Sequence, residues 1–141
     1  MEIREITRDE KPGVVTLLKN NNLPSEDLND DTVLFVLWEG EHMAGTIGLE
    51  HNGKEGLLRS LCTDEHSRGR GRGTQMVSFL EQYAREKGLS TLYLLTTTAE
   101  AFFSKRNYQR IEREEVPGFL AGTSEFSSVC PASAVIMKKE L

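Results

Sequence analysis

The six residues from Arg68 to Gly73 read R-G-R-G-R-G, and their types and spacing suit them for binding a ligand that carries phosphates. Glycine has no side chain and tolerates positive φ, so backbone N–H groups can come close to a ligand. Where such a loop opens a helix, free N–H groups and the helix dipole form an anion site. The three arginines add positive charge to a chain whose formal net charge is −5. We therefore expect phosphates to bind here, with a pyrophosphate as the natural ligand.

Two other kinds of phosphate-binding loop do not fit this stretch. A Walker A loop needs G-x-x-x-x-G-K-[ST], and no lysine stands where that pattern requires one. The dinucleotide fingerprint G-x-G-x-x-G is not met either, because Gly69, Gly71 and Gly73 are evenly spaced. The alternative is a flexible basic loop that contains glycine by chance. The strand and helix patterns on its two sides count against that alternative.

The elements around the glycine loop predict an α/β domain with one mixed sheet. β-Branched and aromatic residues, together with turn signals such as Asn52-Gly53, predict strands and two hairpins. The expected strands are Glu2–Ile6, Thr32–Trp38, Met43–Leu49, Gly56–Thr63, Leu92–Thr96, Tyr108–Arg113 and Ala134–Met137. The expected helices are Arg8–Asn22, the segment from the end of the glycine loop to about Lys87, and Glu100–Arg106. Pro117–Pro131 is expected to be a long loop.

The composition is that of a single domain over residues 1–141. Hydrophobic residues make up 38% and charged residues 28%, which excludes a wholly disordered chain. The longest apolar run, Val33–Trp38, is too short to span a bilayer, and the charged N-terminus carries no signal segment. The acidic net charge implies no general nucleic-acid surface. Two cysteines without metal-binding spacing argue against a disulfide framework or a zinc site, so we expect a reduced, cytoplasmic setting.

Two segments in this order resemble the GNAT N-acetyltransferases. Leu61–Thr63, four further residues and then Arg68-x-x-Gly71-x-Gly73 are similar to the family's acetyl-CoA motif, which is a strand, [R/Q]-x-x-G-x-[G/A] and a helix. Ala101–Tyr108 is similar to the later segment A-x-x-[FY]-[YF]-x-x-x-G-[FY], with asparagine in place of its glycine. The order of elements also matches. The resemblance covers nearly the whole chain and implies the GNAT acyl-CoA N-acyltransferase fold.

Four further segments resemble a smaller GNAT branch that is linked with arsenic-resistance operons and is similar to the acetyltransferase domain of N-acetylglutamate synthases. They are Gly48–Glu50, Leu57–Leu61, Leu94–Ala99 and Thr123–Ala134. Such enzymes acetylate the α-amine of amino-acid-like substrates. The resemblance therefore implies a small-molecule amine acceptor and leaves room for a homodimer.

The resemblance implies acetyl-CoA as the cofactor and direct transfer of its acetyl group to the acceptor, with no metal. The strand at Leu61–Thr63 then splays from its neighbour and pairs with the pantetheine arm. A backbone N–H near Leu61 or Cys62 would polarise the acetyl carbonyl. The residues expected to bind the cofactor are Leu61, Cys62, Thr63, Arg68, Gly69, Arg70, Gly71, Arg72, Gly73, Thr74, Phe103 and Arg106.

Two charged residues near this strand are candidates for the acceptor site, and each has a plainer alternative. Glu50 could accept the amine proton, directly or through water, or it could be a solvated acid at a turn. Arg59 lies among leucines and must reach solvent or a partner. A guanidinium binds a carboxylate bidentately, so an amino-acid carboxylate fits, and an internal salt bridge is the alternative. The neighbouring Ser60 is counted with Arg59 as a residue that binds the acceptor.

The other polar candidates near the acceptor carry a weaker signal. Thr96 and Thr97 could hydrogen-bond the substrate or the cofactor, and helix capping is the alternative, above all for Thr98. Glu125 lies in the expected long loop, where it could bind an ammonium group or be a surface acid.

The side chains of the cysteines and histidines are expected to have no catalytic role. Cys62 and Cys130 are interpreted as structural residues, with Cys62 a small hydrophobe on a core strand. The three histidines all fall at predicted turns and are expected on the surface.

Many GNAT enzymes carry a tyrosine on the late helix that protonates the leaving thiolate, and this chain has Phe103 at the best-matching position. Tyr83, Tyr93 and Tyr108 are not obvious replacements, and Tyr108 is expected to pack under the sheet. We therefore expect CoA to leave as the thiolate, or to take its proton from water or the departing ammonium. Phe103 would then pack around the pantetheine arm.

Other functions stay open at this stage. The acceptor could be a protein N-terminus, a lysine or a polyamine. An acidic acceptor pocket would favour a polyamine, whereas Arg59 favours a carboxylate. An alternative of another class is a non-catalytic CoA-binding sensor, which would keep the glycine loop but lack groups for proton transfer.

Overall fold

The computed structural model of the chain describes residues 2–23, 25, 32–121 and 134–141. Within these ranges the strands are β1 Glu2–Glu5, β2 Val33–Glu39, β3 His42–Asn52, β4 Glu55–Thr63, β5 Thr91–Thr96, β6 Gln109–Ile111 and β7 Val135–Glu140. The helices are α1 Lys11–Asn20, α2 Arg72–Glu86, α3 Glu100–Ser104 and α4 Gly118–Ala121, with short 3₁₀ helices η1 Arg8–Glu10, η2 Glu65–Ser67 and η3 Arg113–Glu115. Every strand and helix expected from the sequence has a counterpart, so the predicted α/β fold is confirmed.

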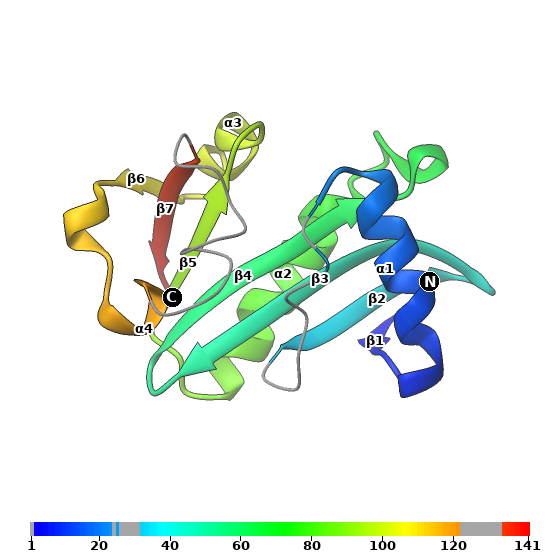
Figure 1. Ribbon diagram of the computed structural model, residues 1–141, viewed down its shortest axis with the longest axis horizontal. Helices are drawn as coiled ribbons and strands as arrows, with labels where there is room; N and C mark the ends of the chain where they lie inside the picture. Colours follow the sequence, from blue (N-terminus) through cyan, green and yellow to red (C-terminus); the bar gives the residue numbers. More distant parts are fainter. Residues whose placement is uncertain (1, 24, 26–31, 122–133) are drawn as a thin grey trace.

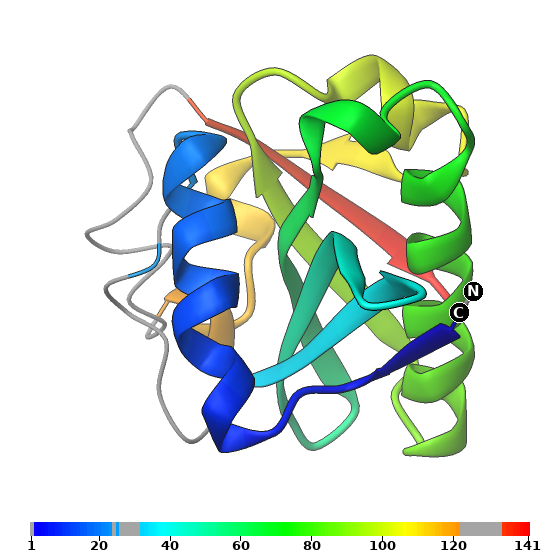
Figure 2. The same ribbon diagram turned by 90° about the vertical axis from the view of Figure 1, so that its right-hand side faces the viewer.

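The strands form one mixed sheet in the order β1-β2-β3-β4-β5-β7-β6. All neighbours are antiparallel except β4 and β5, which are parallel. Helix α2 covers one face of the sheet, and α1 covers the other (Figure 2). Helix α4 lies on the same face as α1, under β5 and β7, where Leu120 packs against Leu57, Tyr93 and Ile136 (Figure 1).

Helix α2 has the apolar stripe that the sequence predicts. Met76, Val77, Leu80 and Ala84 are buried and belong to the main core cluster beneath the sheet. Gly45 on β3 permits this close packing, because a Cβ there would lie 2.6 Å from the Met76 Cε and 2.9 Å from the Cys62 backbone oxygen. The helix ends where Gly88 adopts φ +83°, a conformation that glycine takes without strain.

The sequence-based expectation was wrong in two places beyond β5. The strand expected at Tyr108–Arg113 is shorter, because Glu112 begins a capping box that turns the chain into η3. The expected loop at Pro117–Pro131 opens with α4, and its residues 122–131 lie outside the described part of the chain.

Candidate active site

The strands β4 and β5 pair over only a short length. Their parallel register joins Glu55 with Thr91, Gly56 with Leu92 and Leu57 with Tyr93, and no further pair follows. Beyond this point the two strands diverge toward η2 and α3 (Figure 1). The backbone of the last part of β4 is therefore free to pair with something other than β5.

A β-bulge lies in β4 at the start of the diverging part. The register with β3 steps from Thr46–Cys62 to Gly48–Arg59, so β4 contains one extra residue. Ser60 within this bulge has φ +58°, a left-handed conformation that favours glycine. The splay expected around Leu61 is present as well, because the pairing of β4 with β5 ends at Leu57.

The glycine loop stands at the same end of β4 and leads into α2. Gly69 and Gly71 have φ of +80° and +74°, and Gly71 is the N-cap of α2. A side chain would strain the backbone at both positions. The first turn of α2 therefore presents backbone N–H groups beside the diverging strand, as an anion site requires.

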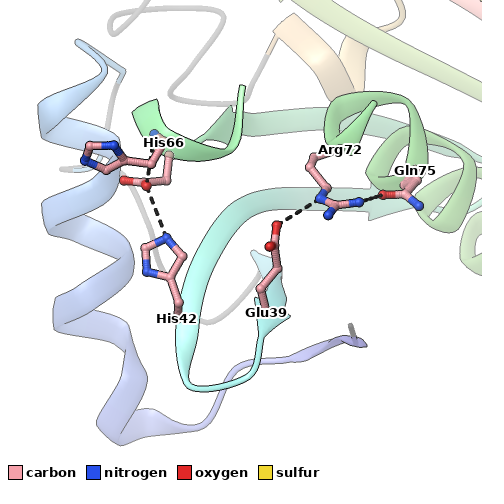
Figure 3. Close-up of polar contacts among 6 residues, drawn as sticks. Glu39, His42, His66, Arg72 and Gln75 are labelled. Atoms are coloured by element: carbon pink, nitrogen blue, oxygen red, sulfur yellow. Dashed lines mark hydrogen bonds and ion pairs between the residues drawn. The ribbon is translucent and has the colours of Figure 1, made fainter. Parts of the chain in front are cut away.

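Two of the three loop arginines bind other parts of the protein. Arg68 donates a hydrogen bond to the Asn21 side chain at the end of α1. Arg72 pairs with Glu39 at 2.9 Å and donates to Gln75 Oε1 at 3.2 Å (Figure 3). Arg70 is exposed and makes no hydrogen bond or ion pair within the described residues. The guanidinium groups of Arg68 and Arg72 thus hold the loop against other elements, whereas Arg70 has no such contact among the described residues.

Helix α3 packs against the first turn of α2. A Cβ on Gly73 would lie 3.2 Å from the Phe102 ring, so glycine allows this approach. The Arg106 guanidinium lies over the Phe102 ring, with its Cζ 3.6 Å from the ring centroid. It also donates hydrogen bonds to the Phe102 carbonyl and to Thr74 Oγ1. Contacts with Phe102 thus bring together three residues that are expected to bind the cofactor, namely Gly73, Thr74 and Arg106.

Glu50 and Arg59 lie on the face of the sheet that α1 and α4 cover, and they pair with each other. Arg59 Nη1 lies 2.8 Å from Glu50 Oε2, and the two side chains are 1% and 10% exposed. Arg59 Nε also donates to Ser60 Oγ at 3.2 Å, within the bulge. The internal salt bridge, one of the two alternatives for Arg59, is thus present, and the solvated acid at a turn is wrong for Glu50. The pair lies beside the diverging part of β4.

The threonines at the end of β5 and just after it, Thr96 to Thr98, make different contacts. Thr96 Oγ1 accepts hydrogen bonds from the backbone N–H groups of Thr98 at 3.4 Å and Ala99 at 2.9 Å. Thr96, and not Thr98, therefore supports the turn into α3. Thr96 and Thr97 line a cavity of about 480 Å³ beside α3 that also includes Ser104. Glu125 and Cys130 lie outside the described residues.

Cys62 and the histidines take the structural places expected of them. Cys62 is buried, and burial raises the pKa of its thiol, which disfavours a nucleophilic thiolate. His42, His51 and His66 are exposed. His42 contacts the carboxylate of Asp64, and the backbone N–H of His66 donates to that same carboxylate (Figure 3). This cluster shapes η2 ahead of the glycine loop.

Phe103 and Tyr108 are buried together on the α2 side of the sheet. Their rings meet edge to face at 5.5 Å, and the Tyr108 hydroxyl donates to Glu81 at 2.9 Å. Burial and the neighbouring Glu81 carboxylate raise the pKa of Tyr108 far above its ordinary value. Tyr108 is therefore poorly suited to give a proton to a thiolate, and its expected position under the sheet is confirmed.

Sequence reasoning missed the residues that support this site. Asn21, Glu39 and Thr46 each contact the loop or the bulge from another element. Nothing in the local sequence marks them, because each contact joins positions between 14 and 47 residues apart.

Among the described residues, no group of three or more histidine, cysteine or acidic side chains is arranged to hold a metal ion. None of the helices described is both long and apolar enough to cross a membrane.

Comparison with known proteins gives a consistent result. A model of the Acetyltransferase (GNAT) family matches residues 1–111. An amino-acid acetyltransferase of Pseudomonas paraeruginosa is 34% identical over 71 residues, which are 50% of this chain and 16% of that protein. One from Ralstonia nicotianae is 29% identical over 125 residues, covering 82% of this chain and 28% of that protein. This chain thus spans less than a third of the length of these relatives.

Solved structures with the same fold include two that contain coenzyme A. N-acetylglutamate synthase from Neisseria gonorrhoeae, complexed with coenzyme A and L-arginine, has a TM-score of 0.82 at 18% identity, over 99% of this chain and 33% of that one. Rv2747 from Mycobacterium tuberculosis, in complex with CoA, has a TM-score of 0.81 at 21% identity, over 100% of this chain and 99% of that one.

Proposed function

Because this chain belongs to the GNAT family of acetyltransferases, we propose that it transfers the acetyl group of acetyl-CoA to the amine of a small amino-acid-like acceptor. The names of its relatives and the CoA in structures of similar fold support this proposal. The more specific part of the proposal, that the acceptor is an amino acid, depends on Arg59.

The donor is proposed to lie along the diverging part of β4. The pantetheine arm pairs with the backbone of Leu61–Thr63, and the pyrophosphate meets the N–H groups at Gly71 and the first turn of α2. Arg70 supplies the free positive charge of the loop. Phe103 belongs to α3 and is buried in the core, so its proposed contribution is to hold α3 against that core and not to pack around the pantetheine arm as expected from the sequence.

The single observation that carries the acceptor assignment is the buried guanidinium of Arg59 beside the splay. Glu50 and Ser60 already compensate this buried cation, and we propose that an acceptor carboxylate binds to it in addition, because a guanidinium carries five N–H donors. An acceptor carboxylate fits there bidentately and holds its α-amine toward the thioester. Glu50, paired with Arg59, either orients that guanidinium or takes the amine proton.

The reaction is a direct displacement. The neutral amine forms a C–N bond with the acetyl carbon, and a backbone N–H near Leu61 or Cys62 stabilises the oxyanion. The C–S bond then breaks, and CoA leaves as a thiolate or takes the proton lost by the ammonium. No tyrosine of the described residues is needed for this step.

A panel of acceptors, assayed by release of the CoA thiol, tests the proposal. Free amino acids, glutamate among them, should be acetylated. Their carboxamides and the amines that lack the carboxylate should lose at least 10-fold in kcat/KM, because a charge-assisted bidentate contact contributes about 1.5–3 kcal/mol. Equal activity toward amines without a carboxylate would refute the role of Arg59 and favour a polyamine, a lysine or a protein N-terminus.

Glu50→Gln separates the two roles of the carboxylate. If Glu50 accepts the amine proton, kcat falls by 10² or more and the acid limb of its pH profile disappears. If Glu50 only orients Arg59, kcat is kept and the acceptor KM rises. Binding of acetyl-CoA by the wild type with no turnover on any acceptor would favour the sensor alternative.

A further inference from the structure

The hydroxyl of Thr46 lies against the β4 bulge. Thr46 is fully buried, and its Oγ1 donates a hydrogen bond to the Ser60 backbone oxygen at 2.8 Å. The Cys62 Sγ lies 3.3 Å from the same Oγ1. Because the one hydroxyl hydrogen is already given to Ser60, the Cys62 thiol is the donor in the second contact. The side chain of Thr46 on β3 thus contacts both Ser60 and Cys62 in the bulged part of β4.

Ser60 requires such support. At φ +58° its Cβ is crowded, and a residue other than glycine keeps that conformation only where its surroundings stabilise it. Without the bulge, β4 would continue as a regular strand, and each residue from Leu61 on would shift by one position and turn to the other face. The direction of the N–H groups of Leu61 and Cys62 therefore depends on the bulge.

We propose that Thr46 is a positioning residue for acetyl transfer, whose hydroxyl keeps the bulge in the form that aims a backbone N–H of Leu61 or Cys62 at the acetyl carbonyl. This inference rests on the proposed function, because it assumes that acetyl-CoA lies along β4. Thr46 itself does not touch the reacting atoms.

Thr46→Val removes the hydroxyl and keeps the shape of the side chain, and Thr46→Ser keeps the hydroxyl. The valine variant should lose about 10–100-fold in kcat, since deleting an oxyanion donor outright costs about 10²–10³-fold and this donor is displaced instead. Its KM for acetyl-CoA should rise by a smaller factor than kcat falls, because the glycine loop that is proposed to hold the pyrophosphate is untouched although the pantetheine arm pairs with β4. The serine variant should keep kcat within about threefold. A valine variant with unchanged kcat overturns the proposal.

Residue 60 provides a matched pair for rescue. Ser60→Gly and Ser60→Ala both remove the hydroxyl that contacts Arg59, but only glycine accepts positive φ without strain. Each is combined with Thr46→Val and compared with its own single variant. The glycine background should recover most of the lost kcat, and the alanine background should not. Equal behaviour of the two overturns the proposal.

Two readouts keep the test independent of activity. If Thr46→Val alone does not fold, Ser60→Gly should restore folding where Ser60→Ala fails. Equal failure means that Thr46 serves packing only, and the proposal is then wrong. The second readout is the carbonyl ¹³C signal of bound [1-¹³C]acetyl-CoA, which reports polarisation without any acceptor.

That carbonyl signal should shift toward the free thioester value in Thr46→Val and return with Ser60→Gly. An unchanged signal overturns the role of Thr46. A wild-type protein that binds acetyl-CoA but acetylates no amino acid refutes only the proposed acceptor, and one that binds no acetyl-CoA refutes the proposed donor.

Discussion

The charges of Glu50 and Arg59 should contribute to the free energy of unfolding as a coupled pair. This coupling can be measured without knowing the acceptor. The Arg59 side chain is 1% exposed and the Glu50 side chain 10%, with 2.8 Å between Nη1 and Oε2. Arg59→Met leaves the Glu50 carboxylate buried without that partner. Breaking a buried pair in this way costs about 3–5 kcal/mol of unfolding free energy, out of about 5–15 kcal/mol for a typical domain.

The two single substitutions should lower the free energy of unfolding by different amounts. The double variant should lose less than the sum of these two losses. For a chain of 141 residues, Arg59→Met is expected to lower Tm by roughly 10–20 °C. Glu50→Met should cost less, because Arg59 keeps its contact with Ser60. The double variant has neither charge to desolvate, so it should be more stable than additivity predicts by about 2–3 kcal/mol.

Urea unfolding, followed by the fluorescence of the single tryptophan, Trp38, supplies the four free energies of this cycle. Arg110→Met is the control, because the Arg110–Glu100 pair is 3.9 Å apart with side chains 64% and 44% exposed. It should cost no more than about 1 kcal/mol. Additivity of the two core substitutions within about 0.5 kcal/mol would refute the reasoning, since it would mean that the two charges do not stabilise each other.

Three further predictions concern the elements around the site. Gly45→Ala places a Cβ 2.9 Å from the Cys62 oxygen and should cost about 1–3 kcal/mol in urea unfolding, whereas Gly13→Ala, whose Cβ meets only the flexible end of Met43, should be neutral or stabilising. Tyr108→Phe should keep kcat; a 10²-fold loss with KM intact would reveal a displaced tyrosine acid. Because the pKa of Tyr108 is raised, the wild type should lose stability as pH rises above about 10, and the phenylalanine variant should lose less. Cys62 should resist iodoacetamide until the protein is unfolded, as followed by peptide mass spectrometry, and rapid native labelling would contradict its burial.

The elements that position the site could be predicted from the sequence because each has a local signal. The apolar stripe of α2, the hairpin turn at Asn52-Gly53 and the glycines before α2 are all visible within a few residues. Helix α4 has four residues, which is too short to show a helical period, so it was missed.

The contacts that complete the site could not be predicted, because they depend on register and tertiary packing. The pairing of Arg72 with Glu39 joins positions 33 residues apart, and no spacing rule links them. The bulge is carried by Ser60, although glycine is the residue that would have signalled positive φ. For Arg59 the sequence left two alternatives open, and only the placement of Glu50 across the β3–β4 ladder shows the internal ion pair.

The short parallel join between β4 and β5 also has a consequence for how the chain folds. Strands β1 to β4 are consecutive neighbours in the sheet, with local hairpins from β2 onward, so their pairing closes few long loops. Strand β7 instead pairs with β5 across about 40 intervening residues, which makes its contacts of high sequence separation and slow to form. The same division, at which the donor is proposed to bind, is thus also expected to separate an early-folding half of the sheet from a late one. Native-state hydrogen exchange should resolve them as two cooperative units, with α2, which packs on both, as the element that joins them.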